Sequence, residues 1–192
     1  MKIAVLAVQG AFIEHINMLK KLNVDSFEIR QEKDLEQEFD GIILPGGEST
    51  VMGKLLKELN LYDTLLKKIK AGMPVMGTCA GLILLAEKLS NDDKAYFKTL
   101  PVTVKRNAYG RQLGSFQTVA GVKGVGEIPL TFIRAPYIES VKEGVDIIAT
   151  VDNNIVGVRY ENQLGISFHP ELTEDLSIHK YFVKMIEDAK NN

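Results

Sequence analysis

Cys79 is the single cysteine of this 192-residue chain and lies in the segment GTCAG, with Gly77 and Gly81 two positions to either side. A strand that turns directly into a helix exposes its turn residue, and small neighbours let strand and helix pack closely, as in a nucleophile elbow. Unpaired N–H groups at the helix N-terminus would favour a thiolate and could bind an oxyanion. A lone cysteine is more often a small buried hydrophobic residue, so the segment alone leaves both interpretations open.

A cysteine nucleophile needs a base, and the chain contains 3 histidines. His179 falls in an amphipathic C-terminal segment and is expected to be solvated, whereas His15 is expected to be structural. His169 follows the strand-like run LGISF and precedes Pro170, which disfavours helix at His169 and keeps that position extended. Residues two apart in an extended segment point the same way, so Glu171 could orient the imidazole as the third member of a triad. Taken alone, HPE fits a cap or a turn equally well.

A glycine-rich segment, LPGGEST, follows the apolar run GIIL. Gly46 and Gly47 permit a backbone with positive φ and open N–H groups, and Ser49 or Thr50 could cap a following helix. An ordinary strand-to-helix turn would have the same composition. The segment lacks the spacing and the lysine of a phosphate-binding P-loop.

Strands and helices alternate in the first half of the chain, which is typical of parallel βαβ units. Apolar runs predict strands at 2–8, 26–30, 40–47 and 73–78, and helical spacing predicts helices at 12–22, 49–59, 61–72 and 80–89. Beyond Leu100, short strand-like runs separated by Gly, Asn and Asp predict a largely antiparallel region with a hairpin turn at Glu161-Asn162. A closing helix is expected at about 174–188. No repeat or linker marks a boundary, so we expect one domain over 1–192.

The composition excludes several classes of protein. It has 45% hydrophobic and 25% charged residues with a net charge of -2, and no basic cluster exceeds the pair Lys67-Lys68, so we expect no nucleic-acid partner. No apolar stretch approaches the roughly 20 residues that cross a bilayer, so we expect no membrane partner. The lone thiol excludes an internal disulfide framework and fits the cytoplasm. We expect no metal and no cofactor.

Six segments occur in a characteristic order: LAVQGAFIEH, LPGGEST, GTCAGLILLA, RNAYGRQLGSF, FIRAP and SFHPEL. Together they resemble the class I glutamine amidotransferases and, more narrowly, the glutaminase subunits of pyridoxal 5′-phosphate synthases. The resemblance extends from about Ala4 to Leu172. It implies an α/β, three-layer, flavodoxin-like fold with a mixed central sheet, helices on both faces and antiparallel strands in the C-terminal half, forming a single glutaminase domain over 1–192.

The resemblance also implies roles for individual residues. Cys79 would be the nucleophile, His169 the base and Glu171 its orienter, with the backbone N–H groups of Gly47 and Ala80 forming the oxyanion hole. The positions that line the glutamine site in that family are Gly47, Glu48, Ser49, Arg106, Ile133 and Arg134. An arginine offers fixed donors for an α-carboxylate, although a surface ion pair is the alternative for both arginines. Ile133 would act through its main chain.

The implied activity is hydrolysis of L-glutamine to glutamate and ammonia through a γ-glutamyl thioester. The chain has no room for a domain that consumes ammonia, so the expected partner is a separate, barrel-shaped pyridoxal 5′-phosphate synthase in a hetero-oligomer. In that family the glutaminase is poorly active alone, docks partly through its first helix, and has an oxyanion loop that rearranges on docking. Alternatives are a hydrolase of the DJ-1 and PfpI group, a non-enzymatic regulatory subunit, and a thiol redox sensor.

Overall fold

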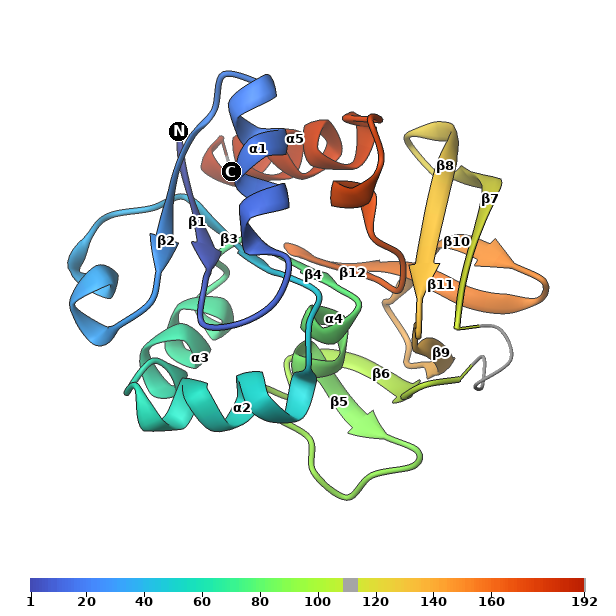
Figure 1. Ribbon diagram of the computed structural model, residues 1–192, viewed down its shortest axis with the longest axis horizontal. Helices are drawn as coiled ribbons and strands as arrows, with labels where there is room; N and C mark the ends of the chain where they lie inside the picture. The colour runs from blue at the N-terminus through green and yellow to red at the C-terminus, as the bar shows by residue number, and fades with distance from the viewer. Residues whose placement is uncertain (109–113, 192) are drawn as a thin grey trace.

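The computed structural model describes residues 1–108 and 114–191 (Figure 1). Its strands are β1 (Lys2–Leu6), β2 (Asp25–Ile29), β3 (Gly41–Leu44), β4 (Val75–Thr78), β5 (Ala86–Leu89), β6 (Leu100–Lys105), β7 (Ser115–Val122), β8 (Gly126–Ile133), β9 (Tyr137–Val141), β10 (Asp146–Val151), β11 (Asn154–Tyr160) and β12 (Gln163–Ile166). Its α-helices are α1 (Phe12–Lys21), α2 (Ser49–Glu58), α3 (Tyr62–Lys70), α4 (Ala80–Leu85) and α5 (Ser177–Lys190), with two short 3₁₀ helices, η1 (Glu32–Glu36) and η2 (Pro170–Leu172). Among these described residues, no helix combines the length and apolar character required to cross a membrane.

The central sheet has the strand order β2-β1-β3-β4-β12-β11-β9-β6-β5, with β10 paired to β11. Its first five strands in this order run parallel. Side chains alternate between its two faces, since Ile3 and Val5 belong to one hydrophobic core while Ala4 and Leu6 belong to the other. Helices α1 and α5 cover one face and α2, α3 and α4 the other (Figure 1). The expected three-layer α/β fold is confirmed.

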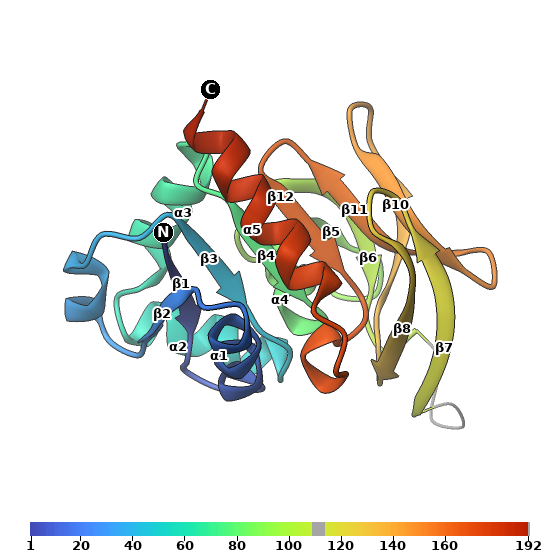
Figure 2. The ribbon, with the colours of Figure 1, turned by 90° about the horizontal axis from the view of Figure 1, so that it is seen from above.

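The C-terminal half of the sheet is mostly antiparallel, as predicted. Strands β12, β11, β9 and β6 pair antiparallel in that order, although β12 also joins β4 in parallel and β5 joins β6 in parallel. Tyr160 pairs with Gln163, which confirms the two-residue hairpin at Glu161-Asn162. A separate ribbon, β7–β8, stands at the end of the molecule far from β2 (Figure 2). It contributes Phe132 to the core beneath α5.

Two sequence-based boundaries were wrong and one strand was missed. The helix predicted over 80–89 ends at Leu85, because Ala86 and Leu89 pair with Leu100 and Val104 of β6, and this pairing overrides the helix preference of Glu87 and Lys88. Strand β9 was not predicted from its sequence YIESV, where polar residues interrupt the apolar run. The last helix begins at Ser177 instead of about 174.

Candidate active site

Cys79 lies at a sharp turn between β4 and α4. Its backbone has φ 50° and ψ -102°, a strained conformation for a residue with a side chain. The two flanking glycines are required by close packing: a Cβ on Gly77 would lie 2.6 Å from the carbonyl of Gly81, and one on Gly81 would lie 2.0 Å from the Leu44 carbonyl oxygen. The elbow predicted from GTCAG is therefore present.

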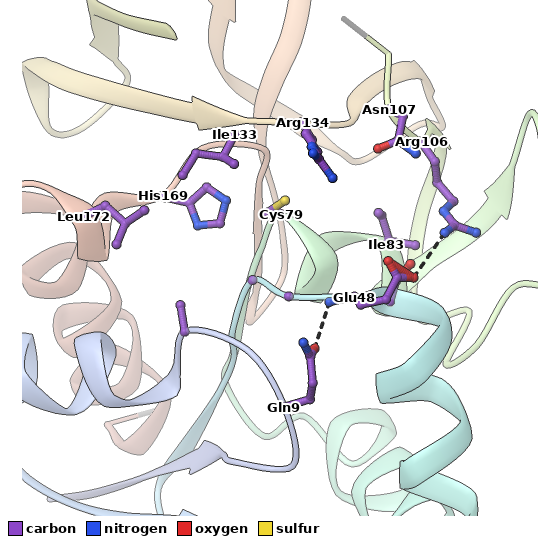
Figure 3. A pocket seen from close by; sticks show the side chains of 14 residues that line it. Gln9, Glu48, Cys79, Ile83, Arg106, Asn107, Ile133, Arg134, His169 and Leu172 are labelled. Carbon is purple, nitrogen blue, oxygen red and sulfur yellow. Dashed lines mark hydrogen bonds and ion pairs between the residues drawn. The ribbon is translucent and has the colours of Figure 1, made fainter. Parts of the chain in front are cut away.

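His169 reaches the same place from the end of the neighbouring strand β12. The Cys79 N–H donates to the Ile166 carbonyl at 2.8 Å, and the His169 N–H donates to the Thr131 carbonyl of β8 at 2.8 Å. These bonds attach the elbow to β12 and the His169 segment to β8. Figure 3 shows the imidazole of His169 beside the sulfur of Cys79. The carboxyl ends of adjacent parallel strands are where ligands bind in open α/β sheets.

Glu171 accepts a hydrogen bond from His169 Nδ1 at 2.6 Å, as predicted, but the reason given was wrong. Glu171 lies in the 3₁₀ turn η2, not in an extended segment, and the turn brings its carboxylate back beneath the imidazole. Burial raises the pKa of Glu171, but interactions with neighbouring groups, including the hydrogen bond from His169 and its positive charge, outweigh this effect and lower the pKa below its usual value. The carboxylate is therefore ionised.

The charge on His169 follows from its neighbours. Burial lowers its pKa, but hydrogen bonding to Cys79 and to Glu171 and the charges on both partners raise the pKa to about 10. At neutral pH the ring is an imidazolium, which can stabilise a negative sulfur and can release a proton to a leaving group. Such a cysteine–imidazolium pair is suited to nucleophilic acyl transfer.

The two glycines of LPGGEST do not adopt the positive φ that glycine permits. They are instead sites of close approach. A Cβ on Gly46 would lie 2.3 Å from His169 Cε1, and one on Gly47 would lie 2.4 Å from Gln9 Oε1. The prediction of open donors is consistent with the structure, because the N–H groups of Gly47 and Ala80 have no hydrogen-bond acceptor within the described residues.

A cavity of about 460 Å³ opens in front of Cys79 and His169 (Figure 3). The side chains and backbone around it include every residue expected at a glutamine site: Gly47, Glu48, Ser49, Arg106, Ile133 and Arg134. Its size suits a small molecule, and it combines cationic, anionic and backbone groups. Glu171 does not line the cavity, since it is buried behind His169.

The polar residues around the cavity are held in part by residues outside its lining. Arg106 forms an ion pair with Asp92 at 2.7 Å and approaches the Glu48 carboxylate at 3.5 Å. Glu48 also caps α2 by accepting from the Thr50 N–H, so the prediction of Ser49 or Thr50 as the cap was wrong. Arg134 has φ 43°, which turns the chain at the end of β8.

Sequence reasoning missed two residues at this site. Gln9 lines the cavity and its Oε1 accepts from the Glu48 N–H at 2.8 Å, as Figure 3 shows. Its segment LAVQGAFIEH was recognised, but nothing in the segment indicates a polar contact 39 positions away. Asp92, the partner of Arg106, falls in an irregular segment without a pattern. The motif RNAYGRQ lies partly outside the described residues, at 109–113.

The two other histidines are both buried, so the prediction of a solvated His179 was wrong. His179 lies on the face of α5 that packs beneath α1, where its Nε2 is 2.9 Å from His15 Nδ1. His15, expected to be structural, lies between His179 and Glu171.

Comparison with known proteins identifies close relatives. A model of the SNO glutamine amidotransferase family matches residues 5–188. The chain is 61% identical over 191 residues to a protein of Desulfitobacterium hafniense (strain Y51) named pyridoxal 5′-phosphate synthase subunit PdxT, covering 100% of this chain and 96% of that protein. A protein of the same name from Haemophilus influenzae (strain PittEE) is 54% identical, with coverage of 98% and 100%. A solved structure described as a glutamine amidotransferase has a TM-score of 0.91 and 40% identity, covering 96% of this chain and 98% of its own.

Proposed function

The chain belongs to the SNO glutamine amidotransferase family, and from this premise we propose how its site hydrolyses L-glutamine to glutamate and ammonia as the glutaminase subunit of a pyridoxal 5′-phosphate synthase. The observation that carries the mechanism is that Cys79 and His169 line a cavity of about 460 Å³ while Glu171, buried behind it, holds His169 by a hydrogen bond at 2.6 Å. We further propose that residues 1–192 act as one glutaminase domain.

Glutamine binds with its side-chain amide toward Cys79 and its α-amino acid end toward Glu48, Arg106 and Arg134. A carboxylate anion would pair with the guanidinium groups, and the ammonium group with Glu48. Arg106 already has two acidic neighbours, Asp92 and Glu48, which hold its guanidinium at the cavity wall. Ser49 and the main chain of Ile133 complete the lining.

The Cys79 thiolate, having given its proton to His169, attacks the amide carbon of the glutamine side chain. A carbon–sulfur bond forms, and the carbonyl electron pair moves to oxygen. The N–H groups of Gly47 and Ala80 stabilise the resulting oxyanion, because both are without an acceptor in the described residues. A main-chain donor in this role is worth roughly 10²–10³ in rate.

The tetrahedral intermediate then expels ammonia. The carbon–nitrogen bond breaks as the His169 imidazolium transfers its proton to the departing nitrogen, leaving a γ-glutamyl thioester. Water attacks the thioester while His169 takes the proton of the water, and the carbon–sulfur bond breaks to release glutamate and the thiolate. Glu171 stays ionised and holds the ring by its Nδ1–H throughout.

We propose that the ammonia passes to a separate, barrel-shaped synthase in the same complex, in the cytoplasm, where a single free thiol remains reduced. Apolar side chains are exposed around the site, including Leu172 and Ile133 on the cavity wall, at 39% and 40% exposure, and Ile13 on α1. Exposed apolar side chains beside a site favour protein docking. We expect faster glutamate release with the synthase present; equal rates would contradict this coupling.

The chemistry is tested by Cys79→Ala in the complex with the synthase, assayed by glutamate release from L-glutamine. Without a nucleophile the rate should fall by roughly 10⁴-fold or more, while the unfolding temperature changes little. Ser140→Ala, an exposed substitution on β9, serves as the control and should keep full activity. Turnover by the Cys79→Ala protein at the unmodified rate would refute the mechanism.

A further inference from the structure

His15 and His179 form a buried pair behind the active site. His15 lies on α1 and His179 on α5, and both are 0% exposed. His15 Nδ1 is 2.9 Å from His179 Nε2, and the ring centroids are 5.1 Å apart. Two buried imidazoles need a reason to be retained, because burying polar groups costs free energy unless they are hydrogen-bonded.

The second nitrogen of His15 points toward the triad. His15 Nε2 lies 3.2 Å from Thr78 Oγ1 and 3.5 Å from Glu171 Oε2. Thr78 directly precedes Cys79. The Oε2 atom of Glu171 is buried and has no other polar partner among the described residues, whereas Oε1 accepts from His169. His15 therefore faces the carboxylate oxygen that His169 leaves unused.

The positions of the protons follow from these contacts. Burial lowers the pKa of both His15 and His179, so both rings are neutral. A neutral His15 must direct its N–H, not a lone pair, at the negative oxygen of Glu171, so the proton is on Nε2. Its Nδ1 then accepts from the Nε2–H of His179. The remaining nitrogen, His179 Nδ1, carries a lone pair and has no partner in the described residues.

We propose that His15 is a positioning residue of the triad: its Nε2–H, shared between Thr78 Oγ1 and Glu171 Oε2, holds the carboxylate that orients His169, while His179 fixes the tautomer of His15. The donors thus run in one direction, from His179 through His15 to Glu171. This interaction keeps Glu171 from rotating away from His169 Nδ1. The inference rests on the proposed roles of Cys79, His169 and Glu171.

Three substitutions of His15 separate positioning from simple packing. The amide nitrogen of Gln can reach the place of imidazole Nε2, that of Asn reaches only the place of Nδ1, and Leu supplies neither. In the complex with the synthase, His15→Leu and His15→Asn should lower kcat for glutamine hydrolysis by roughly 10–100-fold, the usual effect of losing a partner that orients a functional side chain. His15→Gln should recover most of this loss, and KM should stay within about twofold throughout, since His15 touches no part of the glutamine cavity.

His179→Leu is the matched control, because it removes a buried imidazole from the same pair without removing the donor to Glu171. It should lower the unfolding temperature about as much as His15→Leu but reduce kcat less. If His15→Leu fails to fold, the kcat values of His15→Gln and His15→Asn still test the proposal, since both variants carry an amide and differ in where its nitrogen lies. Equal kcat values for those two variants, or losses in kcat that follow unfolding temperature alone, would overturn the proposal.

Failure of this inference is distinguishable from failure of the proposed function. If Cys79→Ala abolishes turnover while all His15 variants remain fully active, the triad stands and the role of His15 is refuted. If Cys79→Ala remains active, the mechanism itself is wrong.

Discussion

The triad proposed for catalysis and the residues proposed to recognise glutamine belong to one site but are held in different ways. Cys79, His169 and Glu171 are 7%, 6% and 6% exposed and are fixed by backbone bonds between strands and by buried hydrogen bonds. Glu48 and Arg106 lie on the outer wall, and the Glu48 side chain is 52% exposed. Their contacts are ion pairs: the pair of Arg106 with Asp92 is largely shielded from water, and the longer pair of Arg106 with Glu48 is open to water on the Glu48 side. The proposed triad is thus held by backbone and buried hydrogen bonds, whereas Glu48 and Arg106 on the outer wall are held by side-chain ion pairs.

The largest effect is expected from a substitution in the buried triad. Glu171→Gln keeps the shape of the side chain but removes the charge that orients and stabilises the His169 imidazolium. We expect kcat to fall by roughly 10²–10⁴-fold with little change in KM. Glu174→Gln is the control, since Glu174 is exposed and pairs with Lys21 at the surface. A loss confined to KM would show that Glu171 belongs to recognition.

A substitution in the outer wall of the cavity should instead change KM more than kcat. Arg106→Gln removes a charged donor for the substrate carboxylate, so KM for glutamine should rise roughly 10–100-fold while kcat changes only a few-fold. Arg159→Gln, which alters an arginine that contacts Tyr181 away from the cavity, should leave both constants unchanged. Steady-state kinetics over a wide glutamine range decides between the two patterns, and an unchanged KM for Arg106→Gln would contradict its role.

The packing that shapes the elbow can be tested by stability. Gly81→Ala would place its Cβ 2.0 Å from the Leu44 carbonyl oxygen, so the free energy of unfolding should fall by about 1–3 kcal/mol. Gly121→Ala, on β7, meets nothing within 4 Å and should be neutral. Denaturant unfolding of the two variants measures the difference. Equal stabilities would mean that the elbow is not tightly packed.

The contacts of the buried triad could be predicted from the sequence better than those of Arg106 and Glu48 on the outer wall. GTCAG is a local pattern whose geometry follows from strand, turn and helix chemistry, so the elbow was predicted. The His169–Glu171 contact was also predicted, but from an extended segment where the structure has the 3₁₀ turn η2. The ion pair of Arg106 with Asp92 and the bond from Glu48 to Gln9 depend on the fold and have no local signal. His179 was misjudged for the same reason, because its partner is 164 residues away in the chain.

The smallest predicted effect concerns the charge of His169. Cys79 is one of the groups that raise the pKa of His169 to about 10, so Cys79→Ala should lower this pKa. Because the folded-state pKa lies above the ordinary 6.5, the ring's stabilising effect is complete below pH 6.5 and is lost as pH rises toward 10. In the Cys79→Ala protein, the stabilising effect of the charged ring should therefore be lost at a lower pH. NMR titration of the imidazole signals measures the shift, and an unchanged pKa would mean that the sulfur and ring do not interact.

The central proposal is that the sulfur of Cys79 attacks the side-chain amide carbon of bound glutamine. The most direct measurement treats the complex with diazo-oxo-norleucine, a glutamine-like electrophile, and locates the adduct by peptide mass spectrometry. We expect one label, on Cys79, that excess glutamine prevents and that His169→Ala greatly slows. A label on another residue, or labelling of Cys79 that glutamine does not affect, would contradict the account.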